Sequence, residues 1–520
     1  MNTYKFLVFK SIKHKPNTLL HTSKLTPNMA SNTKPKKGFL PPQTSLTRIL
    51  FFIVLFTISA RLVLYVPSSI SNPFSSHVRP WTGDLRGAEF AWNRLELGGS
   101  RAPPVVLKIA VFSRKWPIGT TPGGMERHAQ TLHTALSRRG HRVHIFTSPP
   151  GDQRGAAALQ EMNMQSNGSP TFSSPRIHFH EGEPGRWAYN RAWEQFLEEN
   201  SQDPFDVVHS ESVALPHSLA KTLPNLAVSW HGIALESLSS YIYQDLALRP
   251  PGEPISPGFN RSVQGVIPKV LNEIRFFHNY AHHVATSDSS GEILRDVYQI
   301  PTQRVHVILN GVDEEDFRQD LQLGHQFRSR IGIPQNASLI LGVSGRLVKD
   351  KGHAILHEAF SRFIKRHPDA YLIVAGSGPW ENRYKDLGRQ VLVLGSLNPS
   401  QLRAFYNSID IFVNPTLRPQ GLDITLMEVM MSGKAVLASR FPSIKGTIVV
   451  DDEYGYMFSP NVESLLQGME QVVKEGRSRL AQRGKACRRY AASMFTATKM
   501  ALAYERLFLC IKNETFCMYP

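Results

Sequence analysis

The chain has few cysteines: three in 520 residues, at positions 487, 510 and 517. So few exclude a disulfide scaffold, and their spacing offers no four-ligand zinc site. Cys510 and Cys517 are near enough in sequence to form a disulfide, and Cys487 would then be unpaired. We expect instead that all three cysteines are free buried thiols. The composition, 41% apolar and 19% charged, excludes a collagen-like or wholly disordered chain. At roughly 150 residues per domain, this length allows two large domains with appendages.

Acidic residues are missing from the beginning of the chain. Residues 1–83 contain eleven Lys and Arg and no Asp or Glu before Asp84. Most of the formal net charge of +17 therefore belongs to this segment, and the remaining 48 basic and 42 acidic residues nearly balance. Because no basic patch interleaved with aromatic residues occurs in the rest, the charge does not indicate a nucleic-acid-binding protein, and no nucleic-acid partner is expected.

An apolar run, residues 49–66, follows nine of these basic residues and contains one charge, Arg61. As a helix it would span about 27 Å, close to the ~30 Å of a bilayer core. The run begins too deep for a signal peptide of about 15–30 residues. The excess of basic residues ahead of it predicts a signal anchor with the N-terminus in the cytosol, hence a single-pass type II membrane protein, expected in the Golgi.

Other interpretations of this beginning remain open. A Ser/Thr-rich, acid-poor tail also suits a plastid transit peptide, and an apolar run of this length also suits a buried core helix. The endoplasmic reticulum and the plastid are the alternative locations. Translation from Met29 would leave a shorter basic tail before the anchor. Residues 67–104 are rich in Pro, Ser and Gly and predict a stem.

Strand and helix patterns alternate from residue 105 onward. Residues 105–113 form an apolar run typical of a strand buried on both faces of a parallel sheet. A loop, a helix over 125–139 closed by Gly140, and a strand from Val143 complete one βαβ unit. Residues 148–175 look like an irregular insertion. A second series begins near residue 339, so we predict two doubly wound α/β domains, with ligands bound in a cleft between them. Residues 497–511 predict an amphipathic helix that docks on the body.

Several residues at predicted strand ends could bind an anion or a sugar. Gly123 and Gly124 lie between a strand and a helix, where backbone amides can hold a phosphate, although glycines there also serve tight packing. Arg346 and Lys351 follow the strand 339–344, where two cations would suit a diphosphate; they could equally be solvated surface groups. Gly376 and Gly378 follow the next strand.

Two further candidates lie on either side of the predicted cleft. Glu428 falls in the first turns of a helix, where a carboxylate suits the helix dipole and can accept ribose hydroxyls; a purely helix-stabilising role explains it equally well. His231 follows an apolar strand and could hydrogen-bond a sugar or phosphate, but it is one of twenty histidines.

Together these segments resemble the family-4 retaining glycosyltransferases of the GT-B fold, in a plant-type, membrane-anchored form. The resemblance covers about residues 105–510. It depends on six motifs in the family's order: G-G-M-E-R-H with G-H-x-V, S-W-H-G, V-I-L-N-G-V-D, G-R-L-x-x-x-K-G, A-G-S-G-P and the stretch 420–433. It implies two Rossmann-like domains facing a central cleft.

The implied domains are a basic cytosolic tail (1–48), a transmembrane anchor (49–66), a stem (67–104), an N-terminal acceptor domain (105–320), a C-terminal nucleotide-sugar donor domain (321–490) and a C-terminal helix (491–520).

The resemblance also implies roles for individual residues. Arg346 and Lys351 match the pair that stabilises the departing nucleoside diphosphate, and Glu428 matches the glutamate that binds the donor ribose. Gly124 matches a loop glycine near the phosphate, and His231 a histidine close to the donor sugar. The remaining donor-binding positions are Gly123, Gly345, Gly376, Gly378, Gln420, Gly421 and Leu422. The family typically needs no metal or other cofactor, in agreement with the lack of a D-x-D tripeptide.

The chain departs from the family's pattern at two positions of this last stretch. Gln420 replaces the first glutamate of the E-x7-E signature, and Leu422-Asp423 stand in place of a second glycine that members commonly carry in this loop. The expected function is that of a retaining hexosyltransferase using a nucleotide-sugar, expected to be a UDP-sugar, and an acceptor that the sequence does not reveal. The alternative is a catalytically weakened nucleotide-sugar-binding or scaffold protein.

Overall fold

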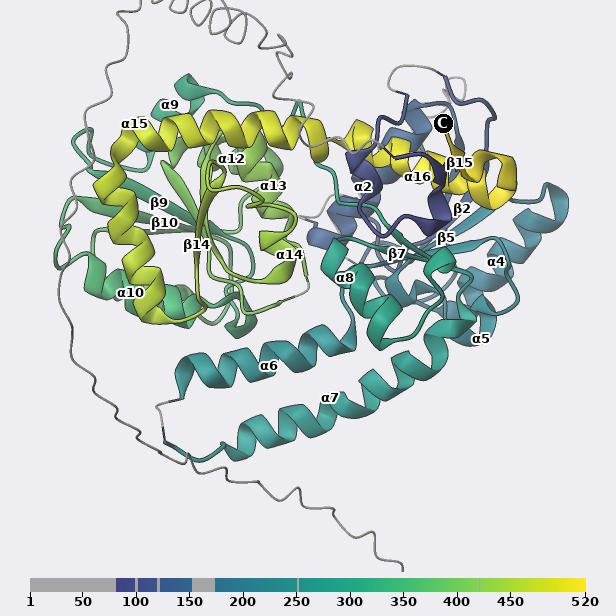
Figure 1. The fold of residues 1–520 in the computed structure, drawn as a ribbon, viewed down its shortest axis with the longest axis horizontal. Helices are drawn as coiled ribbons and strands as arrows, with labels where there is room; N and C mark the ends of the chain where they lie inside the picture. The colour runs from purple at the N-terminus through teal and green to yellow at the C-terminus, as the bar shows by residue number, and fades with distance from the viewer. Residues whose placement is uncertain (1–80, 99–101, 119–121, 152–173, 250–251, 420) are drawn as a thin grey trace, which may run out of the picture. The chain divides into compact units, whose positions relative to one another are not determined.

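The computed structural model describes residues 81–520, except 99–101, 119–121, 152–173, 250–251 and 420. Within these ranges the chain forms two α/β lobes, each built on one parallel sheet (Figure 1). The prediction of two doubly wound α/β domains is therefore confirmed. Most of the predicted irregular insertion, 148–175, falls outside the described residues.

The first lobe contains a seven-stranded sheet in the order β4-β3-β2-β5-β6-β7-β8. The winding reverses between β2 and β5, and in such sheets ligands bind beyond the carboxyl ends of the strands at the reversal. The strands are β2 (Lys108–Phe112), β3 (Arg142–Thr147), β4 (Arg176–Phe179), β5 (Val207–Glu211), β6 (Leu226–Trp230), β7 (His282–Ala285) and β8 (Val305–Val307). The helices are α2 (Gly124–Arg138), α4 (Tyr189–Gln202), α5 (His217–Ala220), α6 (Ala234–Leu248), α7 (Pro257–Phe276) and α8 (Asp288–Glu292).

The second lobe contains a six-stranded sheet in the order β11-β10-β9-β12-β13-β14, with its reversal between β9 and β12. The strands are β9 (Leu339–Ser344), β10 (Ala370–Ala375), β11 (Val391–Gly395), β12 (Ile411–Asn414), β13 (Ala435–Ser439) and β14 (Gly455–Phe458). The helices are α9 (Leu321–Arg330), α10 (His353–Phe363), α11 (Glu381–Lys385), α12 (Pro399–Ser408), α13 (Ile424–Met431), α14 (Pro442–Lys445) and α15 (Val462–Met494).

Local sequence accounts for many of these boundaries. The apolar run predicted as the first strand forms β2, whose five residues are all buried, as a strand covered by helices on both faces requires. Helix α2 ends where Gly140 adopts a φ of +98°, which favours glycine. Helix α12 begins with a capping box between Asn398 and Gln401 and has Pro399 in its first turn.

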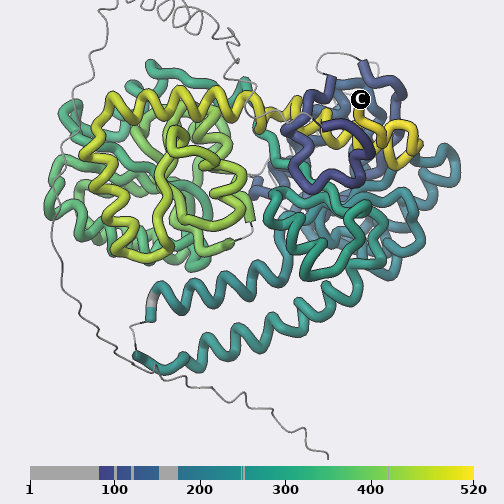
Figure 2. The backbone as a smooth tube through the Cα atoms, in the orientation of Figure 1, coloured from purple at the N-terminus to yellow at the C-terminus, as the bar shows by residue number. Residues whose placement is uncertain are grey.

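The C-terminal part of the chain leaves the second lobe and completes the first. After α15, helix α16 (Ala497–Lys512) packs on α2, and its side chains Met500, Tyr504, Leu507 and Phe508 are fully buried in the core of the first lobe. This face of α16 is the one that the sequence predicts to dock. Figure 2 shows the yellow C-terminal segment beside the purple segment at residues 81–98.

Residues 81–98 form part of the first lobe, whereas the stem was expected to extend to residue 104. Strand β1 (Gly83–Asp84) pairs with β15 (Met518–Tyr519), and the 3-10 turns η2 (Leu85–Gly87) and η3 (Trp92–Arg94) follow. Leu85, Trp92 and Leu95 are fully buried among residues of β2 and α16. Their apolar side chains explain the difference, because burying them stabilises the folded state.

The expectation of three free thiols is wrong for two of them. Cys510 and Cys517 form a disulfide, because the chain turns back after α16 through η9 (Glu514–Cys517) and brings the two side chains together. Cys487 is the free and buried thiol among the described residues.

The expected location must be corrected as well. In the described part of the chain no helix is both long and apolar enough to cross a membrane. The long helices α7 and α15 carry charged side chains along their length. A single-pass membrane protein of the Golgi, endoplasmic reticulum or plastid therefore has no support from these residues. The apolar run 49–66, on which that expectation depended, lies outside the described residues.

Candidate functional site

A cleft of about 570 Å³ lies where the carboxyl ends of the two sheets meet. Loops after β2 and β6 line it from the first lobe, and loops after β9 and β10 from the second. Most of the donor-site residues expected from the sequence line this cleft: Gly123, Gly124, His231, Gly345, Arg346, Lys351, Gly376, Gly421 and Leu422. Gly378 and Glu428 are not among the lining residues, and Gln420 lies outside the described residues.

The loops after β9 and β10 approach each other closely enough to need glycine. Gly376 has a φ of +137°, and a Cβ there would overlap the carbonyl oxygen of Gly345. Gly352 has a φ of +73°, and a Cβ there would overlap the carbonyl oxygen of Pro415. These two positions fix the loop that carries Arg346 and Lys351, so that both cations lie at the cleft.

The two cations differ in their surroundings. Arg346 is exposed to the cleft, and its guanidinium has no ion-pair partner within the described ranges. Lys351 forms an ion pair with Asp423, which also accepts a hydrogen bond of 3.1 Å from Asn414 Nδ2. Burial acts to raise the pKa of the Asp423 carboxyl, but the charge and hydrogen bond of Lys351 outweigh it and lower the pKa. The carboxylate of Asp423 is therefore paired with Lys351, and both side chains line the cleft.

Glu428 connects the two lobes. From α13 its carboxylate forms an ion pair with Arg127 of α2 and accepts a hydrogen bond of 2.7 Å from Tyr406 Oη. Its side chain is 1% exposed, and burial raises the pKa of its carboxyl against the opposing effect of Arg127. Each oxygen of Glu428 therefore already has a protein partner, and the side chain lies behind the residues that line the cleft.

A second ion pair crosses the cleft at its other end. Arg418, in the loop after β12, binds Glu236 of α6. Burial raises the pKa of the Glu236 carboxyl, and the charge of Arg418 opposes that effect. The pair lies beside Gly232 and Gly421, the glycines next to it in each lobe.

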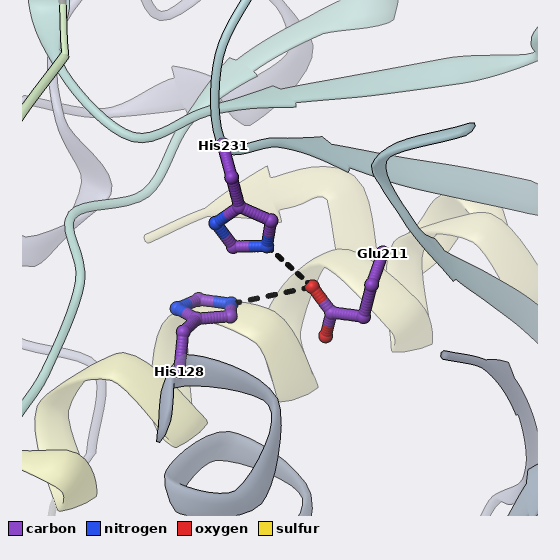
Figure 3. Close-up of side chains that lie close together, drawn as sticks. All are labelled: His128, Glu211 and His231. Atoms are coloured by element: carbon purple, nitrogen blue, oxygen red, sulfur yellow. Dashed lines mark hydrogen bonds and ion pairs between the residues drawn. The ribbon is translucent and has the colours of Figure 1, made fainter. Parts of the chain in front are cut away.

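On the first lobe, His231 is held by a buried carboxylate. Its Nε2 lies 2.5 Å from Glu211 Oε2, and the ring of His128 packs edge-on against it with ring centroids 4.5 Å apart (Figure 3). Ser212 Oγ accepts a hydrogen bond of 3.3 Å from the backbone N–H of His231. The cleft therefore presents a histidine whose orientation is fixed from behind.

Sequence reasoning did not find several of these residues. Arg127 lies within the G-G-M-E-R-H motif, yet nothing marks it as the partner of a glutamate 301 positions later. Glu211 ends an apolar strand and Arg418 precedes Gln420, but each is ordinary in its local sequence. Their partners could be found only from the packing of the two lobes. The missed residues at or behind the cleft are Arg127, Glu211, Glu236, Tyr406 and Arg418.

Two family models match the chain. The model for "Glycosyltransferase Family 4" matches residues 122–316, and the model for "Glycosyl transferases group 1" matches residues 326–490. The matches fall on the first and second lobe respectively and contain the residues that line the cleft. With two parallel-sheet lobes and a central cleft, the chain is an enzyme of the GT-B fold, and the two matches identify it as a glycosyltransferase.

Individual relatives agree with this assignment. An uncharacterized glycosyltransferase of Methanocaldococcus jannaschii is 24% identical over 71% of this chain and 90% of that protein. The phosphatidyl-myo-inositol mannosyltransferase of Mycobacterium tuberculosis is 24% identical over 74% of this chain and 93% of that protein. Among solved structures, Anabaena Alr3699/HepE in complex with UDP-glucose covers 77% of this chain and 99% of its own, with a TM-score of 0.55 at 16% identity. That likeness supports the fold.

Proposed function

We propose that this chain is a retaining hexosyltransferase that moves a sugar from a nucleotide-sugar, a UDP-sugar in the first instance, to an acceptor hydroxyl. The observation that carries the proposal is the pair Arg346 and Lys351 at the carboxyl end of β9, lining a cleft large enough for such a donor. The solved structure of HepE, which shares the fold, contains UDP-glucose. The mannosyltransferase relative supports a hexose as the transferred group.

Three parts of the donor, the diphosphate, the ribose and the transferred sugar, have proposed partners. The diphosphate lies against Arg346, Lys351 and the backbone amides near Gly124, where α2 begins and its dipole favours an anion. The ribose hydroxyls reach Glu428, and the transferred sugar lies near His231. Lys351 must then exchange Asp423 for a phosphate oxygen, or contact both.

The proposed reaction keeps the configuration at the anomeric carbon. The acceptor oxygen attacks from the face on which the diphosphate leaves, the bond to the phosphate oxygen breaks, and that oxygen takes the proton of the acceptor hydroxyl. Arg346 and Lys351 stabilise the negative charge that grows on the leaving phosphate. Because two cations supply this charge, we propose a reaction without a metal ion, so EDTA is expected to leave the rate unchanged.

A panel of nucleotides and nucleotide-sugars tests the proposal. Calorimetry should detect binding of one nucleoside diphosphate in preference to its monophosphate, since the second phosphate meets Arg346. The bound donor should then be hydrolysed slowly without acceptor and transferred with one. Linkage analysis of the product should find the donor's own anomeric configuration. A protein that neither binds nor cleaves any member of the panel would contradict the proposal.

The second candidate is a nucleotide-sugar-binding protein without turnover. The ion pair of Lys351 with Asp423 favours it, because this pair occupies one of the two cations that a leaving diphosphate needs. The same panel separates the candidates: binding with turnover supports the transferase, and tight binding with no hydrolysis or transfer supports the second.

A further inference from the structure

Glu211, the last residue of β5, is a fully buried carboxylate surrounded by histidines. Its side chain is 0% exposed, and its ion-pair partners in the described part of the chain are histidines only. His231 Nε2 lies 2.5 Å from Glu211 Oε2, and His133 Nε2 lies 3.1 Å from Glu211 Oε1. Burial acts to raise the pKa of this carboxyl, but the imidazoles around it hold the pKa well below its ordinary value. The imidazole nitrogens of His231 and His133 can both donate to the carboxylate, and these hydrogen bonds stabilise its ionised form.

The carboxylate cannot turn away from this position. One oxygen faces His133, whose Nε2 lies 3.2 Å from His209 Nδ1. His209 Nε2 in turn lies 2.8 Å from Ser229 Oγ, and Ser229 Oγ lies 2.6 Å from Tyr504 Oη of α16. This line of hydrogen bonds runs from α16 through the sheet and leaves the other oxygen of Glu211 for His231. Such an arrangement fixes a side chain more firmly than packing alone.

The contact with Glu211 determines which nitrogen of His231 carries the proton. A carboxylate can only accept, so Nε2 donates to it, and in the neutral ring Nδ1 is left with its lone pair. His128, packed on the ring of His231, has a pKa lowered to about 3, chiefly by burial, and is itself neutral. His231 lines the cleft and is 13% exposed.

Hydrogen bonding explains this cluster better than a metal ion does. The ligand atoms of His128, Glu211 and His231 lie within 4.8 Å of one another, a spacing that an ion could also use. However, Glu211 Oε2 and His231 Nε2 are 2.5 Å apart. Two ligands of a tetrahedral zinc with bonds of ~2.0–2.1 Å lie roughly 3.3 Å apart. The observed distance is that of a short hydrogen bond and is too close for two ligands of one zinc ion.

We propose that Glu211 is the positioning residue for His231: it fixes the ring with the proton on Nε2, so that Nδ1 accepts a hydrogen bond from a hydroxyl of the sugar being transferred. This inference depends on the proposed function. In the transition state the sugar ring gains positive charge, and its hydroxyls become better donors. An acceptor held beside them then binds the transition state more tightly than the ground state and raises kcat.

The test uses the full chain and the donor that the panel identifies. Glu211→Gln removes the charge and lets the side-chain amide donate to His231 Nε2. The proton of the His231 ring then moves to Nδ1, which can no longer accept a hydrogen bond from the sugar. We expect kcat to fall on the order of 10- to 100-fold, with the dissociation constant of the nucleoside diphosphate changed less than about twofold, because His231 acts on the sugar. In a His231→Ala background, Glu211→Gln should add no further loss. A purely structural role would lower kcat in both backgrounds.

Glu505→Gln is the matched control. Glu505 is also a buried carboxylate of the first lobe that pairs with a histidine, His141, at 2.9 Å, but it lies away from the cleft. We expect it to lower Tm and leave kcat unchanged. If wild-type protein cleaves no donor, the proposed function fails; if wild type and Glu211→Gln cleave at the same rate, the positioning role alone fails.

Proton NMR makes the test independent of whether Glu211→Gln folds. A hydrogen bond of 2.5 Å between imidazole and carboxylate should give a strongly deshielded proton signal in wild type, lost in His231→Gln. Absence of such a signal from wild type would overturn the proposal. So would stoichiometric zinc in the purified protein whose removal by chelation abolishes activity.

Discussion

Asp423 lies between Lys351 and Asn414 at the beginning of α13. Its negative charge stands next to the place where we propose that the diphosphate binds. A phosphate that approaches Lys351 must therefore compete with a carboxylate that is already paired.

Asp423→Asn should strengthen binding of the nucleoside diphosphate. The amide keeps the shape and the contact with Asn414 but frees the charge of Lys351 and removes a repulsion. We expect the dissociation constant of the diphosphate to fall about tenfold, which corresponds to about 1.4 kcal/mol. Calorimetry measures it, and Asp203→Asn, which removes an exposed carboxylate paired with Arg142, serves as the control. Weaker binding of the diphosphate to Asp423→Asn would show that Asp423 supports the site instead.

The buried histidine pair of the first lobe should make the protein sensitive to acid. His144 Nδ1 lies 3.0 Å from His178 Nε2, and burial lowers the pKa of His144 to about 3 and that of His178 to about 4. Below pH ~6.5 the unfolded chain binds protons that the folded chain excludes. The contribution of this pair to the free energy of unfolding is therefore fully present above pH ~6.5 and is lost as the pH falls toward about 4.

His144→Phe should flatten this dependence. The ordinary pKa of histidine is about 6.5, so pH 5 lies about 1.5 units below it. One such histidine therefore lowers the free energy of unfolding by about 2 kcal/mol at pH 5 relative to pH 7. Tm measured between pH 7 and 5 should fall less in His144→Phe than in wild type, whatever its value at pH 7. The exposed His325, changed to Phe, should leave the slope as it is. Equal slopes for His144→Phe and wild type would contradict the account.

The residues of the site could be predicted where a local motif contains them. Arg346, Lys351 and the glycines follow strands and lie in short recognisable stretches. Asp423 was found as a departure from such a stretch. Arg127 with Glu428, and Glu211 with His231, depend on contacts between distant elements, and a single sequence contains no signal for such pairs.

Helices α6 and α7 form the element that extends from the first lobe toward the second. Tyr243 of α6 packs edge-on against Phe441, with ring centroids 4.8 Å apart, and Glu236 pairs with Arg418. Helix α7 contains Pro268 and two glycines, Gly258 and Gly265, which weaken a helix in isolation. Packing of Val266 and Val270 against α6 overrides this local preference.

Replacing only Arg418 of the ion pair between Arg418 and Glu236 should lower the free energy of unfolding more than replacing both partners. Arg418→Met leaves the carboxylate of Glu236, 2% exposed, without its cation. We expect a loss on the order of 2 kcal/mol, less than for a fully buried pair because Arg418 is 26% exposed. The double variant Arg418→Met with Glu236→Gln should recover most of it. Thermal unfolding of the two single variants, Arg418→Met and Glu236→Gln, and of the double variant measures this, and additive losses would contradict a direct pairing.

For the whole molecule, the two ends of the described chain complete the first lobe. Helix α16 and the segment 81–98 bury apolar side chains against β2 and α2. The alternation of strands and helices predicted both lobes, because each βαβ unit is local. The return of α16 to the first lobe could be expected only in part: its apolar face was visible in the sequence, but not the surface it covers.

Leu507→Ala tests this arrangement. Leu507 is fully buried in α16, so the cavity should lower the free energy of unfolding of the first lobe by about 2–5 kcal/mol. Leu246→Ala, on the exposed side of α6 at 61% exposure, should change it by less than about 0.5 kcal/mol. Denaturant unfolding followed by fluorescence measures both. A loss for Leu507→Ala as small as that of the control would mean that α16 is not part of this core.

The central claim is that the cleft transfers a sugar from a nucleotide donor by stabilising the departing phosphate. Donor turnover by Arg346→Ala tests it most directly, with Arg366→Ala, a cation of the second lobe that pairs with Glu470, as the control. The account predicts that Arg346→Ala lowers kcat by about 100-fold or more, as for other contacts made to transition-state charge, while Arg366→Ala turns over at the wild-type rate. Full turnover by Arg346→Ala would contradict it.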